Sequence, residues 1–168
     1  MTDVAAELLG LLDIERLEVD LFRGIGSGGE TSKRIYGGQV IAQALAAAYR
    51  TVPDRLCHSL HAYFIRPGDP SIPVIYQVDR ARDGGSFTTR RVVAIQHGKQ
   101  ILNMAASFHV EEEGWDYQHE MPDVAGPEGL ANREELRDRW APHVPEHMRR
   151  DFLRPRPIEI REVAPRDL

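Results

Sequence analysis

The sequence predicts a single α+β domain in which one nearly apolar helix is enclosed by a curved antiparallel sheet. Three observations support this prediction. Residues 36–50 form a strong helix-forming segment whose only polar residues are Gln39, Gln43 and Arg50. Four later segments are rich in β-branched and aromatic residues, as strands are. Short turn sequences join those four segments, which favours antiparallel neighbours.

The chain is expected to begin with a helix over residues 4–12, because apolar residues recur there at helical spacing, with Thr2 or Asp3 as N-cap. Apolar and acidic residues then alternate over 17–21, which predicts one half-buried strand. The glycines of segment 24–29 formally match G-x-G-x-x-G. No helix and parallel strand are predicted to follow them, so we interpret the segment as a flexible loop.

The helix of residues 36–50 carries its polar residues on one side. At 100° per residue, Gln39, Gln43 and Arg50 fall with Ala46 on a narrow stripe, and all other positions are apolar or small. Such a helix should be covered by other elements on nearly all sides. Pro53 ends it.

The covering elements are expected to be four strands, at residues 58–65, 74–82, 87–96 and 101–110. Turn clusters separate them at residues 66–70, 83–85 and 97–98. The result would be a meander of long strands, with the helix against its concave face. That arrangement is an α+β domain and not a doubly wound one.

The composition changes after Val110, where acidic residues and recurring prolines begin. We therefore place a domain at residues 1–112 and a proline-rich linker at 113–168. One short helix is expected in the linker, with Asn132 as cap and Glu135 completing a capping box. Residues 158–163 alternate like the start of a new strand, so the linker is expected to lead into a second domain that this chain lacks.

Composition narrows the class of protein. The 168 residues are 42% hydrophobic and 28% charged with a net charge of −5, which is typical of a soluble globular protein and does not indicate nucleic-acid binding. Cys57 is the only cysteine, which favours a reducing compartment. We find neither a signal peptide nor an apolar run long enough for a membrane span, and we predict a cytoplasmic protein.

Candidate catalytic side chains are sparse. His58 and His61 lie three apart on a predicted strand and should face opposite sides, so no metal site and no cofactor are expected. Cys57 and His58 suggest a thiol nucleophile only if a third group orients them, and none is evident. A buried structural cysteine and an ordinary strand histidine are the favoured interpretations.

The start of the predicted helix is the stronger candidate. The first N–H groups of a helix lack internal partners, and Gly37 and Gly38 would let a ligand carbonyl approach them closely. That geometry can polarise a thioester carbonyl and stabilise its oxyanion. A tight loop packed on the sheet is the alternative. Four arginines lie near turns and strand ends: Arg66, Arg82, Arg90 and Arg91. They could bind substrate phosphates, and the alternative is that they form salt bridges or a solvated face.

With these residues in view, the chain resembles the type II acyl-CoA thioesterases, the TesB family. The matching segments are Leu21-Phe-Arg-Gly24, Tyr36-Gly-Gly-Gln-Val40 with Gln43-Ala44, His58-Ser59, Phe64 with Arg66-Pro-Gly-Asp69, Arg82-Asp83-Gly84 with Ser86-Phe87, and Ala105-Ala-Ser-Phe108. The resemblance implies two tandem hotdog domains, of which this chain is the N-terminal half. It also implies that the family's catalytic Asp, Thr or Ser, and Gln lie in the second domain. Gln39 occupies the place that corresponds to that Asp.

The resemblance implies hydrolysis of fatty acyl-CoA to free acid and CoA, with acyl-CoA and another hotdog domain or copy as partners. The weak catalytic candidates are Gln39 and His58. The predicted substrate-binding residues are Gly37, Gly38, Gln39, Tyr63, Phe64, Arg66, Arg82 and Phe87. A non-catalytic module that binds acyl-CoA or only pairs with another hotdog remains the alternative. Hydration of an acyl thioester would need an Asp/His pair near the helix start, and the sequence shows none.

Overall fold

The computed structural model describes residues 4–27 and 33–164. The N-cap candidates Thr2 and Asp3 and the loop glycine Gly29 lie outside the described residues. Contacts divide the chain into a larger unit, Glu7–Glu113, and a smaller unit that contains the chain from Gly114 onward together with the residues before Glu7. The larger unit holds the sheet and the apolar helix.

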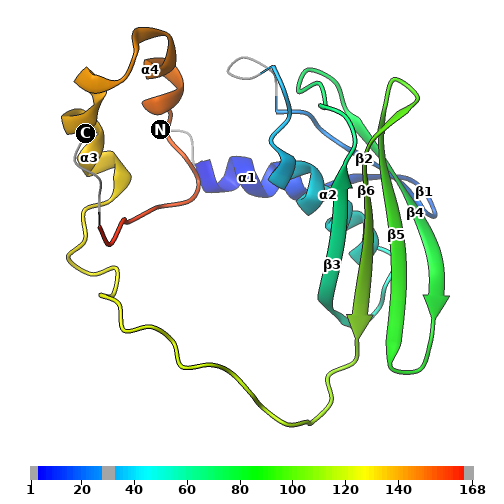
Figure 1. Cartoon of the computed structure of the whole chain (residues 1–168). Coiled ribbons are helices and arrows are strands. Elements are labelled where there is room, and N and C mark those ends of the chain that lie inside the picture. Colours follow the sequence, from blue (N-terminus) through cyan, green and yellow to red (C-terminus); the bar gives the residue numbers. More distant parts are fainter. Residues whose placement is uncertain (1–3, 28–32, 165–168) are drawn as a thin grey trace. The chain divides into compact units, whose positions relative to one another are not determined.

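A six-stranded antiparallel sheet forms the framework of the larger unit (Figure 1). Its strands are β1 (Glu15–Glu18), β2 (Leu21–Gly24), β3 (Leu56–Phe64), β4 (Val74–Asp83), β5 (Phe87–Gln96) and β6 (Lys99–His109). The spatial order is β1-β2-β4-β5-β6-β3. The four long strands therefore agree with the predicted ones to within two residues at each end.

Two features of the sheet differ from the prediction. Residues 17–21 were expected to be one strand, but β1 and β2 form a hairpin that turns at Val19 and Asp20. The Arg16 guanidinium donates to the carbonyls of Glu18 and Val19 and holds this turn. The alternating apolar side chains Leu17 and Val19 are exposed, so the alternation did not signal burial here.

The second difference concerns β3. The predicted meander is correct for β4, β5 and β6, but β3 pairs with β6 and lies at the edge of the sheet. The connection between β3 and β4, residues 65–73, is therefore not a hairpin turn. It carries three prolines and is long enough to pass the ends of β6 and β5 before β4 begins.

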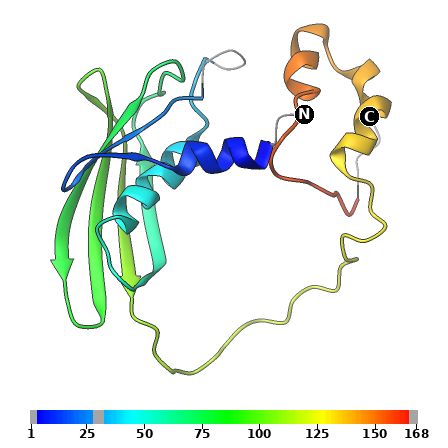
Figure 2. The same ribbon diagram turned by 180° about the vertical axis from the view of Figure 1, so that it is seen from behind.

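Helix α2 (Gly37–Tyr49) lies against one face of the sheet (Figures 1 and 2). Its small alanines, Ala44, Ala47 and Ala48, are fully buried and let the strands approach closely. The expectation that the helix is covered on nearly all sides is wrong for the described residues, because Ile41 and Leu45 are only partly buried.

The two glutamines of the polar stripe, Gln39 and Gln43, are buried, whereas Arg50 at its end is exposed. The Gln43 side chain is inaccessible to solvent; its Nε2 donates to the carbonyls of Leu11 (2.5 Å) and Ile25 (3.2 Å). Its Oε1 accepts from the Tyr76 hydroxyl at 2.7 Å. Leu11 belongs to α1 (Val4–Leu12), so one glutamine connects α1, α2, β4 and the segment after β2. Satisfied hydrogen bonds explain why these polar side chains lie inside.

The far end of α2 is fixed by Arg90, whose side chain is almost fully buried. Its guanidinium donates to the hydroxyl and the carbonyl of Thr51, just beyond the helix, at 2.8 and 3.0 Å. It also donates to Asp83 at 2.6 Å, and this bond holds the pKa of Asp83 below its usual value. Arg90 is therefore a salt-bridging structural residue, the interpretation that the sequence favoured.

The smaller unit contains α3 (Arg133–Trp140), a 3₁₀ helix η1 (Ala141–His143) and α4 (Glu146–Phe152). The capping box predicted for α3 is present, since Asn132 and Glu135 exchange two hydrogen bonds of 2.8 Å. The sequence predicted one helix and missed η1 and α4. Residues 158–163 form no strand in the described structure, and Arg161 makes an isolated bridge to Asn132. Among the described residues, no helix has the length and apolar character to cross a membrane.

Candidate functional site

The candidate site begins at the N-terminus of α2. The N-cap residue Tyr36 is extended and makes no capping hydrogen bond with its side chain, because a phenol cannot reach back to its own helix as a short oxygen side chain does. The carbonyl of Tyr36 accepts from Gln39 and Val40. The N–H groups of Gly37 and Gly38 are left at the positive end of the helix dipole, without an acceptor within the helix.

Two aromatic rings lie directly on these glycines. A Cβ atom on Gly37 would lie 2.7 Å from the ring of Phe64, and one on Gly38 would lie 2.4 Å from the ring of Tyr36. Neither position can accept a side chain unless a ring moves. Both rings are largely exposed, so they line the helix start without sealing it. The sequence singled out Phe64 but not Tyr36, although Tyr36 directly precedes the glycine pair.

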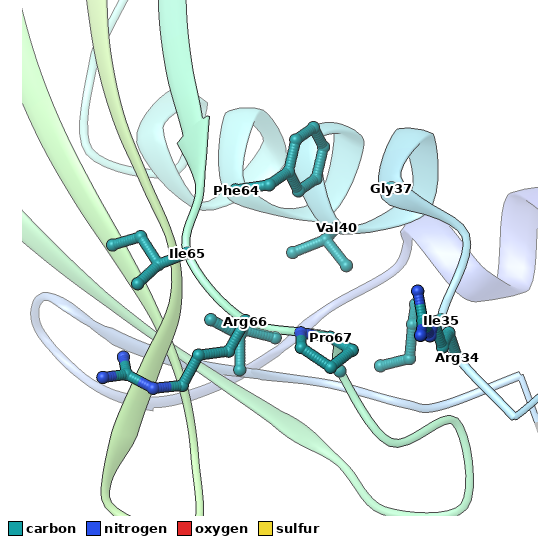
Figure 3. A pocket seen from close by; sticks show the side chains of 10 residues that line it. Arg34, Ile35, Gly37, Val40, Phe64, Ile65, Arg66 and Pro67 are labelled. Carbon is teal, nitrogen blue, oxygen red and sulfur yellow. The ribbon is translucent and has the colours of Figure 1, made fainter.

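A cavity of about 390 Å³ opens beside this first turn (Figure 3). It is lined by Arg34, Ile35, Gly37, Val40, Phe64, Ile65, Arg66, Pro67, Gly68 and Ile101. The lining is mostly apolar, and two arginines are the charged residues among the described part of it. The size of the cavity is within the range of small-molecule sites. Such a surface suits a ligand that has an apolar part and an anionic part.

Three predicted substrate-binding residues, Gly37, Phe64 and Arg66, line this cavity. Gly38 belongs to the same helical turn but does not line it. The Arg66 guanidinium donates to the carbonyl of Gln100 at 2.8 Å, which fixes it near the start of β6. Sequence reasoning did not select Ile35 or Ile101, because isolated isoleucines carry no signal that separates a cavity wall from an ordinary core.

The other predicted binding residues lie elsewhere. Tyr63 pairs with Asn103 and Phe87 pairs with His109, so both rings are on the outer face of the sheet, opposite α2. Arg82 is at the far end of the helix, since its carbonyl accepts from Arg90. A helix of this length spans roughly 20 Å, which separates Arg82 from the cavity.

Gln39, one of the two weak catalytic candidates, is buried on the β2 side of the helix. Its Nε2 donates to the carbonyl of Ile25 at 3.1 Å, beside the bond from Gln43 to the same oxygen. Gln39 does not line the cavity. Its visible role is to hold the segment after β2 against α2.

The histidines of β3 share a face, contrary to the prediction. A β-bulge between Cys57 and Ser59 interrupts the alternation of side chains. His58 Nε2 lies 2.8 Å from Ser107 Oγ on the outer face, and His61 pairs with Ala105 of that same face. Cys57 packs toward the core, as expected. No group of His, Cys, Asp or Glu among the described residues is arranged to hold a metal ion.

Comparisons with known proteins show the family and the fold. A family model described as "Acyl-CoA thioesterase N-terminal domain" matches residues 27–109. The chain is 40% identical over 162 residues to "Acyl-CoA thioesterase 2" of Haemophilus influenzae, which covers 96% of this chain and 56% of that protein. The crystal structure of acyl-CoA thioesterase II TesB2 from Mycobacterium marinum is 45% identical, with a TM-score of 0.67 over 75% of this chain and 48% of that one.

A hot dog fold protein of unknown function from Alicyclobacillus acidocaldarius aligns with a TM-score of 0.66 at 22% identity, over 75% of this chain and 48% of that one. This likeness confirms the fold: a central helix packed on a six-stranded antiparallel sheet. The chain spans about half the length of the curated relatives it matches.

Proposed function

Because the chain belongs to the acyl-CoA thioesterase II (TesB) family and forms its N-terminal hotdog domain, we propose that it is one half of an enzyme that hydrolyses fatty acyl-CoA. The reaction adds water across the thioester and releases a free fatty acid and the CoA thiol. The observation that carries the proposal is the cavity of mixed apolar and basic lining, placed beside uncapped N–H groups at the start of α2.

In this proposal the apolar wall receives part of the acyl chain or the pantetheine arm. Gly37 and Gly38 N–H groups polarise the thioester carbonyl, and they stabilise the negative charge that develops on its oxygen when water attacks. Arg34 and Arg66 supply positive charge for the phosphates of CoA. Of the two arginines, Arg66 is held near the start of β6 by its bond to the carbonyl of Gln100.

The general base is proposed to come from outside this chain. None of the described residues that line the cavity is Asp, Glu or His, so none can take a proton from water near neutral pH. An amide such as Gln39 cannot do so either. This same observation favours a second candidate function, a module that binds acyl-CoA without turning it over.

The test uses dodecanoyl-CoA and the chain by itself. Calorimetry should show binding, while loss of the thioester absorbance should be no faster than in buffer. Gly37→Ala should weaken binding severalfold, because the new methyl group displaces Phe64 and crowds the N–H groups. Gly85→Ala, at a position with open space, is the matched control and should bind like the wild type. Rapid hydrolysis by the chain alone would contradict the proposal that the base lies elsewhere, and absence of binding would contradict both functions.

We also propose that the domain pairs through β3. This edge strand exposes apolar side chains at Leu56, Leu60 and Phe64. Helix α2 also leaves Ile41 and Leu45 only partly buried. The opposite edge strand, β1, is charged. An apolar edge with unpaired backbone groups favours addition of another strand, from a second copy or another hotdog domain.

Sedimentation tests this pairing. The wild-type chain should form dimers, and Leu60→Arg should shift it to monomers. Leu17→Arg on β1 is a matched control, because Leu17 and Leu60 are 41% and 40% exposed. A wild-type chain that stays monomeric at high concentration would contradict the pairing.

The cytoplasmic location stays part of the proposal and is tested by cell fractionation.

A further inference from the structure

The connection between β3 and β4 forms one wall of the cavity. Its first residues, Ile65 to Gly68, line the cavity, and the remainder runs to Pro73 (Figure 3). At the start of the loop, the N–H groups of Ile65 and Arg66 donate to the carbonyl of Ile101 in β6 at 2.9 and 3.2 Å. β3 and β4 are not neighbours in the sheet, and among the described residues no strand pairs with the loop beyond Arg66. Something other than a sheet ladder must hold that part of its backbone.

One side chain contacts the second half of the loop at four backbone groups. Gln96, the last residue of β5, is 94% buried, with 6% of its surface exposed. Its Oε1 accepts from the N–H of Asp69 at 2.8 Å. Its Nε2 donates to the carbonyls of Asp69 (2.9 Å), Ile72 (3.1 Å) and Pro73 (3.2 Å). A single amide therefore contacts four backbone groups of the loop, with its two N–H donors shared among three carbonyls. No purely donating or purely accepting side chain can do this.

The loop in turn is connected to the start of α2. The N–H of Ile35, two residues before the helix, donates to the carbonyl of Gly68 at 2.9 Å. Gly68 is tightly packed: a Cβ atom there would lie 3.1 Å from both Ile35 and Ile101, and 3.3 Å from Gln96 Oε1, so these side chains would have to shift. The contacts thus run from Gln96 through the loop to Ile35 and the helix entry.

We propose that Gln96 is a positioning residue for the acyl-CoA site: it fixes the cavity wall and the N-terminal turn of α2 relative to each other. Gln96 does not line the cavity, so it acts on a ligand only through the loop. This inference rests on the proposed function for its ligand. Its structural part, the connection from Gln96 to Ile35, can be tested without one.

The experiment compares the wild type, Gln96→Met and the control Gln77→Met, which alters an exposed glutamine of β4. Amide hydrogen exchange and dodecanoyl-CoA affinity are measured on the same proteins. Gln96→Met should speed exchange at Asp69 and Ile35, while the amides of β5 and β6 stay protected. Affinity should fall about tenfold, the change expected for one or two net hydrogen bonds. Gln77→Met should change neither.

Asp69→Ala provides a second variant that folds even if Gln96→Met does not, because Asp69 is exposed. It removes the carboxylate that accepts from Ser71 N–H and Oγ, at 2.8 and 2.6 Å, and so loosens the same loop. Exchange at Ile35 should rise and affinity should fall, both by less than in Gln96→Met.

Faster exchange at Asp69 with unchanged exchange at Ile35 would overturn the proposal, and so would unchanged affinity in a variant whose loop has loosened. A wild-type chain that binds no dodecanoyl-CoA refutes the proposed function instead. In that case the exchange rate at Ile35 alone supports or overturns the role of Gln96 in fixing the helix entry.

Discussion

The buried bond between Tyr76 and Gln43 gives a quantitative test of how α2 is held. Tyr76→Phe removes only a hydroxyl, so packing is kept while Gln43 Oε1 loses its donor at 2.7 Å. Leaving one buried acceptor unpaired costs about 1–3 kcal/mol in the free energy of unfolding. Burial also raises the pKa of Tyr76, so the hydroxyl remains a neutral donor and the cost should not depend on pH in the neutral range.

Urea unfolding followed by far-UV circular dichroism measures this cost. With an m-value of about 2 kcal/mol per M, the midpoint should fall by about 0.5–1.5 M. Tryptophan fluorescence is unsuitable, because Trp115 and Trp140 both lie in the smaller unit.

Tyr63→Phe is the matched control, since Tyr63 is 63% exposed on the outer face of the sheet, and its midpoint should stay near that of the wild type. Equal midpoints for the two variants would refute the reasoning that this bond anchors the helix.

Three further variants test the packing around α2. Gly24→Ala should destabilise the domain strongly in the same urea titration, because a Cβ atom there would lie 2.5 Å from Gln43 Oε1 and 2.9 Å from Tyr76. Gly85→Ala is the control and should be neutral, because a Cβ atom there meets open space. Arg90→Lys should lower the unfolding free energy by about 1–3 kcal/mol, since lysine cannot reproduce the branched contacts to Thr51 and Asp83. The control Arg91→Lys alters an exposed arginine and should leave the unfolding free energy unchanged. Asp83→Asn should make the unfolding free energy depend less on pH under acidic conditions. The pKa of Asp83 is lowered in the folded state, so its carboxylate adds stability above the usual carboxyl pKa of about 3.9. That stability is lost as the pH falls through the folded-state pKa, and the variant has none of it to lose. An unchanged slope below about pH 4 would contradict this assignment.

Much of the fold could be predicted from local pattern. The turn clusters located four strands to within two residues, and the capping box located α3, because these signals depend on neighbours in the sequence. The edge position of β3 could not be predicted this way. Loop 65–73 looks like a turn in sequence, and only the packing of the whole sheet decides which strand β3 joins.

The candidate site was predicted in part. Gly37, Phe64 and Arg66 meet at the cavity because motif residues on the helix start and on the end of β3 converge there. Tyr63 and Phe87 were assigned by their aromatic character alone, and strand register turned both outward. Gln96 gave no signal in sequence, and the polar stripe identified Gln43 without indicating that it is buried. A buried glutamine is recognisable only when its hydrogen-bond partners from distant segments are known.

The central claim, that the first turn of α2 receives the thioester, is tested most directly by nuclear magnetic resonance. Dodecanoyl-CoA should be titrated into the ¹⁵N-labelled chain while backbone amide shifts are recorded. The account predicts the largest shifts at Gly37 and Gly38, with smaller ones at Ile65 and Gly68. Saturable binding whose shifts fall instead on the outer sheet face, around His58 and Phe87, would contradict it.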